Sequence, residues 1–515
     1  MNQNKYSSNI PLDIDSIFNL DIEKWYNEFD FPIKWEEFLL LENDIKSILN
    51  KFIDKYPNHS NLIIINYKIF IEYTNFIFYL KLLNLTKRNI SCSKDNEYVQ
   101  SILNNEIPNK PIINFPNLKN SNYNSIKFRI KYFLKYMRDN KYVFPKIWKN
   151  KLFIMDESRN TNTLKHLQKE HKGQIYSLSF FDFYDSNYQP KINESNLNEI
   201  TQISEKIINE LNQVAKKNNL IFTDKQNLFL LNHTKNLFIK SYKVFLNVSK
   251  SIKNKKINLY IGCNNNYYTR ILSVAIRENK GTIHSFRHGE PFNYLIDMTS
   301  WLDLSLCDYW YEYNDKNINS MKYALKYFPP PNKNKFKIRK MNNSKFQTFD
   351  FKIKSCKSDK ISTVMLIGNF YRNFSFSAAT SVFPTLQFYT ELNIISFLQK
   401  KGYKVIYKIH PENKENIKYF FQKVCQLNNN IYKNFDVITD TFDKSIKYTD
   451  CFAYYYTATS TLFNAIESEK PIYFFDFGLR SFTPDIKKYI NSRFTFKKPN
   501  KFNFVKIKEY LCVEL

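Results

Sequence analysis

The chain has 515 residues, 43% of them hydrophobic, and is long enough for two to four domains with sizeable cores. Lys and Arg (76) outnumber Asp and Glu (48), which gives a formal net charge of +28 and indicates a negatively charged partner. The seven cysteines are far apart and form no CxxC pair, which excludes a disulfide framework and a structural zinc site and indicates a reducing cytoplasm.

Two kinds of anionic partner fit the positive charge. Nucleic acid is the first, but the sequence contains no zinc-finger spacing, no aromatic RNA-binding signature and no Arg-rich arm, so no nucleic acid is expected. An anionic membrane surface is the second, because scattered lysines attract such a surface without any motif. The scarcity of glycine, with 7 residues, is typical of an AT-rich genome, which accounts for part of the lysine excess.

Residues 1–145 are predicted to be a mainly helical N-terminal extension. Segments 25–56 and 125–137 alternate apolar and charged residues at helical spacing. Residues 1–20 are polar and lack the apolar core of a signal peptide. Because this region carries no recognisable chemical motif, an accessory or acceptor-side layer is its expected role.

The most apolar stretch of the chain is residues 62–85. It contains Lys68, Glu72 and Lys81, and charged residues inside a membrane span cost about 2.5–3.5 kcal/mol each. We therefore expect a buried strand followed by a helix in this stretch, rather than a transmembrane segment.

Residues 146–330 alternate short apolar runs with amphipathic helical stretches. A succession of strand, helix, glycine and strand is typical of a parallel α/β unit. Two long amphipathic patterns within residues 193–254 predict a helical insertion. Strands are predicted at residues 152–155, 175–181, 258–261, 282–286 and 308–313. The region is therefore expected to form an N-terminal Rossmann-like domain.

A linker is predicted at residues 331–358, where a proline run leads into a Lys- and Asn-rich stretch without apolar periodicity. A second α/β domain is expected at residues 359–500, beginning with a strand at 361–367, and residues 501–515 form a C-terminal tail. The predicted fold class is therefore α/β, with two Rossmann-like domains and a helical N-terminal extension.

The most informative pattern of the second domain lies within residues 404–477. A β-branched and aromatic run ends at His410-Pro411, and a residue before proline is pushed out of the helical region, so His410 is expected at a strand exit. Ser460 and Thr461 open a helical pattern, where backbone N–H groups, the helix dipole and two hydroxyls favour a phosphate. A structural interpretation stays open, in which these residues only cap a strand and a helix.

The strand that ends at His410-Pro411, with Ser460-Thr461 downstream, resembles the C-terminal donor domain of two-domain (GT-B) surface-polysaccharide glycosyltransferases. It is similar to bacterial CMP-sugar transferases, such as sialyltransferases and capsule Kdo transferases, and to CDP-glycerol glycerophosphotransferases of teichoic acid synthesis. The resemblance implies two domains facing a cleft, with the His and the hydroxyl pair holding the phosphate of a cytidine nucleotide. The acidic pair followed by glycine that supplies the base in sialyltransferases is not found here, which weakens the case for a true sialyltransferase.

His288 follows the strand predicted at residues 282–286. The His-Gly-x-Pro step there resembles the glycerophosphotransferase family, and the resemblance implies that His288 is the base toward the acceptor hydroxyl. An imidazole titrates near neutral pH and can take this proton. Glu290 is the competing base, and Asp182 or Asp185 is the next candidate. A structural His-Gly turn with a solvent-facing Glu is the alternative.

Gly368, Asn369 and Arg372 follow the strand predicted at residues 361–367. The matching loop of GT-B enzymes lies beneath the donor phosphates, so the resemblance implies nucleotide contacts, with Arg372 as the charge partner. An ordinary surface arginine is the alternative. No DxD pattern lies between strands where a metal-dependent GT-A enzyme would need it. We therefore expect no metal and no cofactor, and fixed donors that stabilise the leaving phosphate.

Together these features predict a GT-B glycosyltransferase, cytoplasmic and peripheral to the inner face of the cytoplasmic membrane. It is expected to move an ulosonic acid such as Kdo, or a sialic-acid-like sugar, from a CMP-activated donor to an oligosaccharide or lipid-linked acceptor of a growing surface polysaccharide. A CDP-polyol phosphotransferase of teichoic-acid-like polymer synthesis is the first alternative, since it would use the same residues but attack phosphorus. A basic nucleic-acid-binding protein is the second, and charge is its only support.

Overall fold

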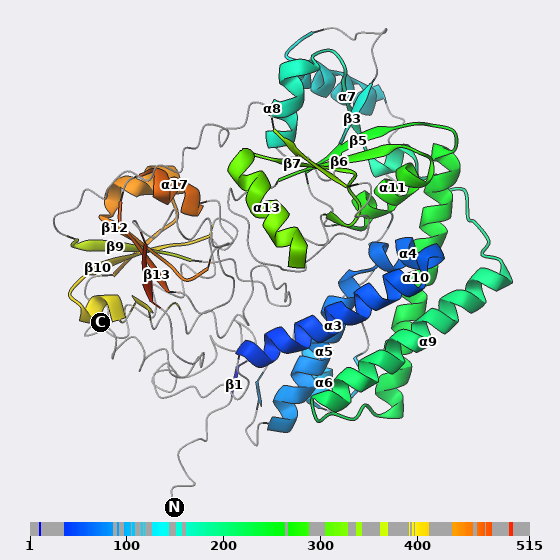
Figure 1. Ribbon diagram of the computed structural model, residues 1–515, viewed down its shortest axis with the longest axis horizontal. Coiled ribbons are helices and arrows are strands. Elements are labelled where there is room, and N and C mark those ends of the chain that lie inside the picture. Colours follow the sequence, from blue (N-terminus) through cyan, green and yellow to red (C-terminus); the bar gives the residue numbers. More distant parts are fainter. Residues whose placement is uncertain are drawn as a thin grey trace, which may run out of the picture.

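The structure is a computed structural model of the chain (Figure 1). Figure 1 shows two separate groups of strands, with long helices gathered beside the first group. The residues that the structure describes are 10–11, 35–85, 90–91, 97–104, 106–108, 115–116, 118, 126–143, 151–156, 161–262, 266–287, 304–327, 336–341, 361–368, 391, 394–395, 397–410, 435–456, 461–468, 470–475 and 494–497.

The N-terminal part of the chain is helical, as predicted. Its elements are β1 (Ile10–Pro11), α3 (Trp35–Lys55), a 3-10 turn (Pro57–His59), α4 (Ser60–Ile65), α5 (Lys68–Leu85), β2 (Ile90–Ser91), α6 (Glu97–Leu103) and α7 (Ile126–Asp139). Helix α3 packs against α5 and α9 (Glu194–Lys217), and α4 packs against α10 (Asp224–Ile252). The N-terminal helices and the two helices of the predicted insertion therefore pack together (Figure 1).

Residues 62–85 contain two helices, so the strand predicted there is wrong. Residues 62–65 lie in α4, and all four side chains are buried. A short, uninterrupted apolar run carries no periodicity, and a buried helical turn cannot be told from a strand by pattern alone. The side chain of Glu72 in α5 is fully buried, and its Oε2 lies 2.9 Å from His233 Nε2. Among the described residues, no helix has the length and hydropathy to cross a bilayer.

The first sheet has six parallel strands in the order β4-β3-β5-β6-β7-β8. They are β3 (Leu152–Met155), β4 (Ile175–Leu178), β5 (Asn258–Ile261), β6 (Thr282–Phe286), β7 (Tyr309–Glu312) and β8 (Lys337–Lys340). The connecting elements are α8 (Thr161–Glu170), a 3-10 turn (Phe180–Asp182), α9, α10, α11 (Tyr267–Glu278) and α13 (Asp315–Tyr327). Three strands have the predicted bounds, whereas the predicted strand 175–181 stops at Leu178 and continues into the 3-10 turn.

Strand β8 corrects the predicted linker. It lies inside residues 331–358 and pairs in parallel with β7, with Lys337 opposite Tyr309, so the first sheet extends beyond residue 330. Its sequence is Lys-Ile-Arg-Lys, which has the charges of a sheet edge and no apolar alternation that a pattern could detect. The next residue, Met341, is fully buried in the core of the first sheet.

One face of the first sheet is aromatic. Tyr260, His284 and Tyr309 stack across β5, β6 and β7, with ring centroids 4.3 and 4.7 Å apart. Phe286 stacks on Tyr311 at 4.4 Å. Helix α8 contributes to this cluster, and α11 packs on the other face of the sheet. Side chains of neighbouring strands therefore form a continuous stacked row in the core.

The second sheet also has six parallel strands, in the order β11-β10-β9-β12-β13-β14. They are β9 (Thr363–Ile367), β10 (Lys404–Lys408), β11 (Phe435–Ile438), β12 (Cys451–Tyr454), β13 (Ile472–Phe475) and β14 (Phe494–Lys497). The described helical elements with them are α16 (Phe442–Ser445), a 3-10 turn (Ile446–Tyr448) and α17 (Thr461–Glu467). The central strands are almost entirely buried, which is typical of a parallel sheet covered on both faces.

Asp450 fixes the amino-terminal ends of the central strands. Its Oδ2 accepts hydrogen bonds from the backbone N–H groups of Ser362 (3.0 Å) and Thr363 (2.9 Å), and from the Ser362 hydroxyl (2.7 Å). The Ser362 hydroxyl bond is the main cause that lowers the pKa of Asp450 below its ordinary value. Asp450 is therefore a structural residue at the sheet edge opposite the strand exits.

The predicted fold class is confirmed, because the chain is α/β with two parallel Rossmann-like sheets and a helix-rich N-terminal part. Helix α7, the last of the predicted N-terminal extension, packs against β4. The domain boundaries at residues 145, 358 and 500, and the cleft between the two domains, stay predictions.

Candidate functional site

The candidate site is the carboxyl edge of the second sheet. Numbered in chain order, its strands lie in the order 3-2-1-4-5-6, which is that of Rossmann folds. The chain runs outward from β9 to β11 on one side and from β12 to β14 on the other, so the strand order reverses between β9 and β12. Ligands of open α/β sheets bind in the crevice outside this reversal point. The residues directly after β9, β10 and β12 are therefore the candidates for ligand contacts.

Gly368 directly follows β9. Its N–H donates to the Lys408 carbonyl at 2.9 Å, and its own carbonyl accepts the Tyr456 hydroxyl at 3.0 Å. A Cβ at this position would overlap the hydroxyl end of Tyr407, so only glycine fits without a shift. Because its N–H is already used within the sheet, Gly368 contributes space at the edge rather than a donor for a phosphate.

A buried carboxylate lies beneath this edge. Glu391 is fully buried, and its two oxygens accept hydrogen bonds from the hydroxyls of Tyr407 and Tyr455, both at 2.6 Å. Burial, followed by the charge of Glu391, raises the pKa of Tyr455 well above its ordinary value, so this hydroxyl stays a donor. No local sequence pattern predicts this cluster, because its members are separated by 16 and 64 positions.

His410 and Thr461 lie at the same edge. His410 is half-buried and comes two residues after β10, at a strand exit as expected. Thr461 is the first residue of α17, and its Oγ1 accepts the Tyr454 hydroxyl at 3.3 Å. Helix α17 has only 7 residues, so side-chain donors rather than a long helix dipole would have to hold an anion. Ser460, Asn369 and Arg372 lie outside the described residues.

The carboxyl edge of the first sheet has a different construction. Arg287 directly follows β6, and its Nη1 lies 3.4 Å from Glu312 Oε1, which also accepts the Trp310 indole N–H at 2.8 Å. Glu312 is fully buried, and burial raises its pKa although Arg287 and Trp310 act in the opposite direction. The backbone N–H of Arg287 donates to the Tyr311 carbonyl at 3.0 Å. His288 and Glu290, the predicted bases, lie outside the described residues.

The two substitute bases have structural contacts. Asp182 Oδ2 accepts the backbone N–H of Ser179 at 2.7 Å and closes a capping box, and burial raises its pKa. Asp185 Oδ1 accepts the backbone N–H of Asn187 at 2.9 Å, and its own N–H donates to Asn247. Both carboxylates therefore stabilise the turn after β4.

The comparisons with known proteins reach only the level of the fold. No family model matches the chain, and no curated protein matches it. Among 19 matching chains of solved structures is a Listeria monocytogenes protein assigned as a UDP-N-acetylglucosamine 2-epimerase, with a TM-score of 0.33, 10% identity, and coverage of 70% of this chain and 87% of that one. Another is a variant of the Thermobaculum terrenum O-GlcNAc transferase, with a TM-score of 0.31, 9% identity, and coverage of 91% and 79%. At TM-scores this low, the likeness supports no conclusion about the activity or the ligand of this chain.

Proposed function

We propose that this chain is a metal-independent GT-B glycosyltransferase that moves an ulosonic acid, such as Kdo, or a sialic-acid-like sugar from a CMP-activated donor to a growing surface polysaccharide. One observation carries the proposal. Gly368, His410 and Thr461, three residues of the expected donor motif, all follow strands at or beside the strand-order reversal of a Rossmann-like sheet. A nucleotide phosphate is the ligand that such a crevice commonly binds.

The proposed chemistry is a displacement at the anomeric carbon of the donor sugar. The acceptor hydroxyl oxygen forms the new bond to this carbon, and the bond from carbon to the CMP phosphate oxygen breaks. His410 and the hydroxyls of Ser460 and Thr461 donate hydrogen bonds to the phosphate, which gains charge as it leaves. His288, or else Glu290, takes the proton of the acceptor hydroxyl.

The surroundings of Arg287 support the base assignment. The residue before His288 is held to β7 by its backbone N–H and by its buried ion pair with Glu312. The chain therefore leaves β6 at a fixed position on the carboxyl edge. A general base needs such a fixed position, and general base catalysis typically increases the reaction rate by about 10²–10⁴-fold.

A nucleotide panel measured by thermal shift tests the donor site. At a concentration 100 times its dissociation constant, CMP should stabilise the protein by about 2.7 kcal/mol. UMP and AMP at the same concentration should stabilise it less. The His410→Ala variant should bind CMP about tenfold or more weakly, because a hydrogen bond to a charged group is worth about 1.5–3 kcal/mol. The matched control is His59→Ala, since His59 contacts Glu199 in the helical region.

Unchanged CMP affinity in His410→Ala would show that this histidine is only structural. Donor assays separate the two reaction types, because a CMP-sugar transferase would be inactive with CDP-glycerol and a CDP-polyol phosphotransferase would use it. The base is identified by comparing His288→Ala with Glu290→Gln, since the true base should lower the transfer rate by about 10²–10⁴ and leave CMP binding nearly intact.

Helix α7 supports the proposed association with an anionic membrane surface. Ile130, Phe133 and Leu134 are 56%, 53% and 62% exposed, and their spacing puts them on one side of the helix. The helix is anchored to the first sheet at its C-terminal end, where the next residue, Asn140, donates its Nδ2–H to the Ile175 carbonyl at 2.8 Å. An apolar stripe on a basic helix is typical of a helix that lies in the membrane interface.

Vesicle sedimentation tests this association. The wild type should bind phosphatidylglycerol vesicles and not phosphatidylcholine vesicles, and the double variant Phe133→Ser/Leu134→Ser should lose most of this binding. Ile221→Ser is the matched control, because Ile221 is 85% exposed but lies away from α7. Equal binding by both variants would remove α7 as the contact surface.

A further inference from the structure

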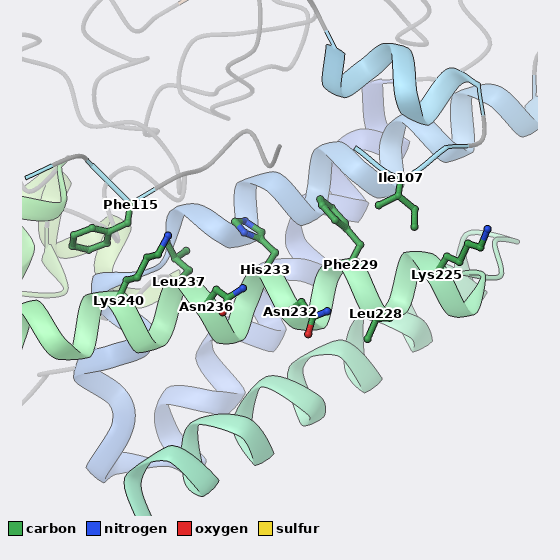
Figure 2. Close-up of a pocket in the computed structure, with 10 residues that line it drawn as sticks. All are labelled: Ile107, Phe115, Lys225, Leu228, Phe229, Asn232, His233, Asn236, Leu237 and Lys240. Carbon is green, nitrogen blue, oxygen red and sulfur yellow. The ribbon is translucent and has the colours of Figure 1, made fainter. Parts of the chain in front are cut away.

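A pocket of about 440 Å³ lies along α10, far in the sequence from the residues of the proposed transfer site (Figure 2). Its volume is in the range of small-molecule sites, roughly 300–1,000 Å³. Lys225, Phe229, His233, Asn236 and Lys240 line it at steps of three or four positions, so they share one side of the helix. Figure 2 shows the two lysines at opposite ends of this row.

The lining groups are arranged along a line. Lys225 and Lys240 are 15 positions apart, which corresponds to about 22 Å at 1.5 Å per residue. Between them lie the exposed carboxamides of Asn232 and Asn236. The pocket therefore offers a positive charge at each end and hydrogen-bonding groups in the middle.

The floor of the pocket is held rigidly. The Nε2 of His233 lies 2.9 Å from Oε2 of Glu72, and both side chains are buried. The His233 ring stacks on Phe229, with centroids 6.2 Å apart, and Phe229 stacks on Phe76. Because neighbouring helices fix these rings, a ligand would meet a preformed surface, which lowers the entropy cost of binding.

The charges of α10 restrict the ligand to an anion. The helix contains five lysines and a single acid, Asp224. One compact phosphate could not contact both Lys225 and Lys240, because they are about 22 Å apart. An acyl chain is also a poor fit, since Asn232 and Asn236 would lose their water without gaining partners.

We propose that this pocket binds a segment of an acidic polysaccharide chain. Such a chain is elongated, carries carboxylates at intervals for the two lysines, and presents hydroxyls to Asn232 and Asn236. The sugar rings would pack on Phe229. This inference rests on the proposed function in one respect only, which is that the bound polysaccharide segment belongs to the acceptor of the proposed transfer reaction. Holding the chain at a second place raises its effective concentration at the transfer site between additions.

Calorimetry with a defined probe tests the proposal. Oligogalacturonate, which has one carboxylate per sugar, should bind the full-length protein, and a neutral maltooligosaccharide of the same length should not. The Lys225→Gln/Lys240→Gln variant should bind oligogalacturonate at least about tenfold more weakly, which corresponds to about 1.4 kcal/mol. The matched control is Lys235→Gln/Lys243→Gln, which removes the same charge from the same helix outside the pocket.

The test has five informative outcomes. Equal losses in the two double variants would overturn the proposal, because the binding would then depend on net charge alone. Preference for a single-stranded oligonucleotide, with a steep fall in salt, would assign the pocket to nucleic acid. Binding of anionic vesicles that is lost in Lys225→Gln/Lys240→Gln would assign it to lipid. CMP affinity of the wild-type protein is measured in parallel: a wild type that binds CMP but not oligogalacturonate would sink this inference alone, whereas a wild type that binds oligogalacturonate but not CMP would sink the proposed function alone.

Discussion

The carboxyl edges of the two sheets are secured by different chemistry. At the first sheet, Arg287 and Glu312 form a buried ion pair that also takes the indole N–H of Trp310. At the second sheet, tyrosine hydroxyls donate to the Gly368 carbonyl and to Glu391. A buried ion pair requires both partners, because removal of one leaves an uncompensated charge, whereas loss of one tyrosine hydroxyl removes a single hydrogen bond.

The two edges also differ in the groups and the space that they leave available to a ligand. In the first sheet the guanidinium of Arg287 is already compensated within the protein, so it serves to hold the chain before His288. In the second sheet Gly368 provides space, and His410 is half-buried at the adjacent strand exit. We therefore expect substitutions at the first edge to act mainly on stability and substitutions at the second to act on both stability and CMP affinity.

Glu312→Ala should have the largest effect. The substitution removes the carboxylate that pairs with the buried guanidinium of Arg287, and breaking a buried pair in this way costs about 3–5 kcal/mol. Urea unfolding followed by circular dichroism measures the loss. Asp315→Ala is the matched control, because Asp315 pairs with Lys340 on the surface and should cost less than about 1 kcal/mol. A loss in Glu312→Ala no larger than in the control would contradict the structural role of the pair.

Gly368→Ala should have the next largest effect, because a Cβ at this position overlaps the end of the Tyr407 side chain. Overpacking of this kind costs about 1–3 kcal/mol, and the shift of Tyr407 should also weaken CMP binding. Adding Tyr407→Ala removes the overlapping hydroxyl and ring carbons, so the double variant should be less destabilised than the sum of the single variants. Simple additivity, measured by urea unfolding, would show that the two residues do not interfere.

The sequence predicted those elements whose local pattern agrees with their place in the fold. Strand β6 follows Gly281 and contains the β-branched Thr282 and Ile283 and the aromatic Phe286, and its predicted bounds match the structure. The sequence does not predict the edge strand β8, because the strand is charged, and it predicts a strand in place of α4, because the apolar run of α4 has no period. In both β8 and α4, the place of the segment in the tertiary structure, rather than its intrinsic propensity, determines whether it forms a strand or a helix.

The candidate site was predictable only in part for the same reason. A strand exit at His410 and a helix start at Thr461 follow from the local sequence, and both are present. The cluster of Glu391 with Tyr407 and Tyr455 depends on contacts between distant parts of the chain, which no spacing rule reveals. The functional roles of His410 and Thr461 stay predictions.

His284 should make the first sheet sensitive to acid. Burial, with smaller contributions from Arg339 and His166, lowers the pKa of His284 from 6.5 to about 3. Between these values the unfolded chain binds a proton that the folded chain does not, so this contribution to stability is complete above pH 6.5 and is lost as the pH falls. At about 1.4 kcal/mol per pH unit, the loss between pH 7 and pH 5 is about 2 kcal/mol.

Urea unfolding of wild type and His284→Phe at pH 7 and pH 5 isolates this effect. Phenylalanine keeps the stacking on Tyr260 and Tyr309 but has no titrating group. The variant loses the contact with the Tyr311 hydroxyl at 3.1 Å, and this cost is the same at both pH values. The difference between the two pH values should therefore shrink by about 2 kcal/mol in the variant, and an unchanged difference would mean that another group carries the acid sensitivity.

Tyr456→Phe should have the smallest effect on stability and is the sharpest test of the second edge. The substitution removes one hydrogen bond to the Gly368 carbonyl, which is worth about 1 kcal/mol. Tyr403→Phe is the matched control, because Tyr403 contacts the Tyr473 hydroxyl at 3.3 Å in the same sheet but lies just before β10, at the opposite edge. If the bond to Gly368 holds the chain in place for the nucleotide, CMP affinity should fall severalfold in Tyr456→Phe and stay unchanged in Tyr403→Phe. Equal CMP affinities in the two variants, with similar losses of stability, would mean that both tyrosines support the sheet alone and that the donor site owes its shape to other residues.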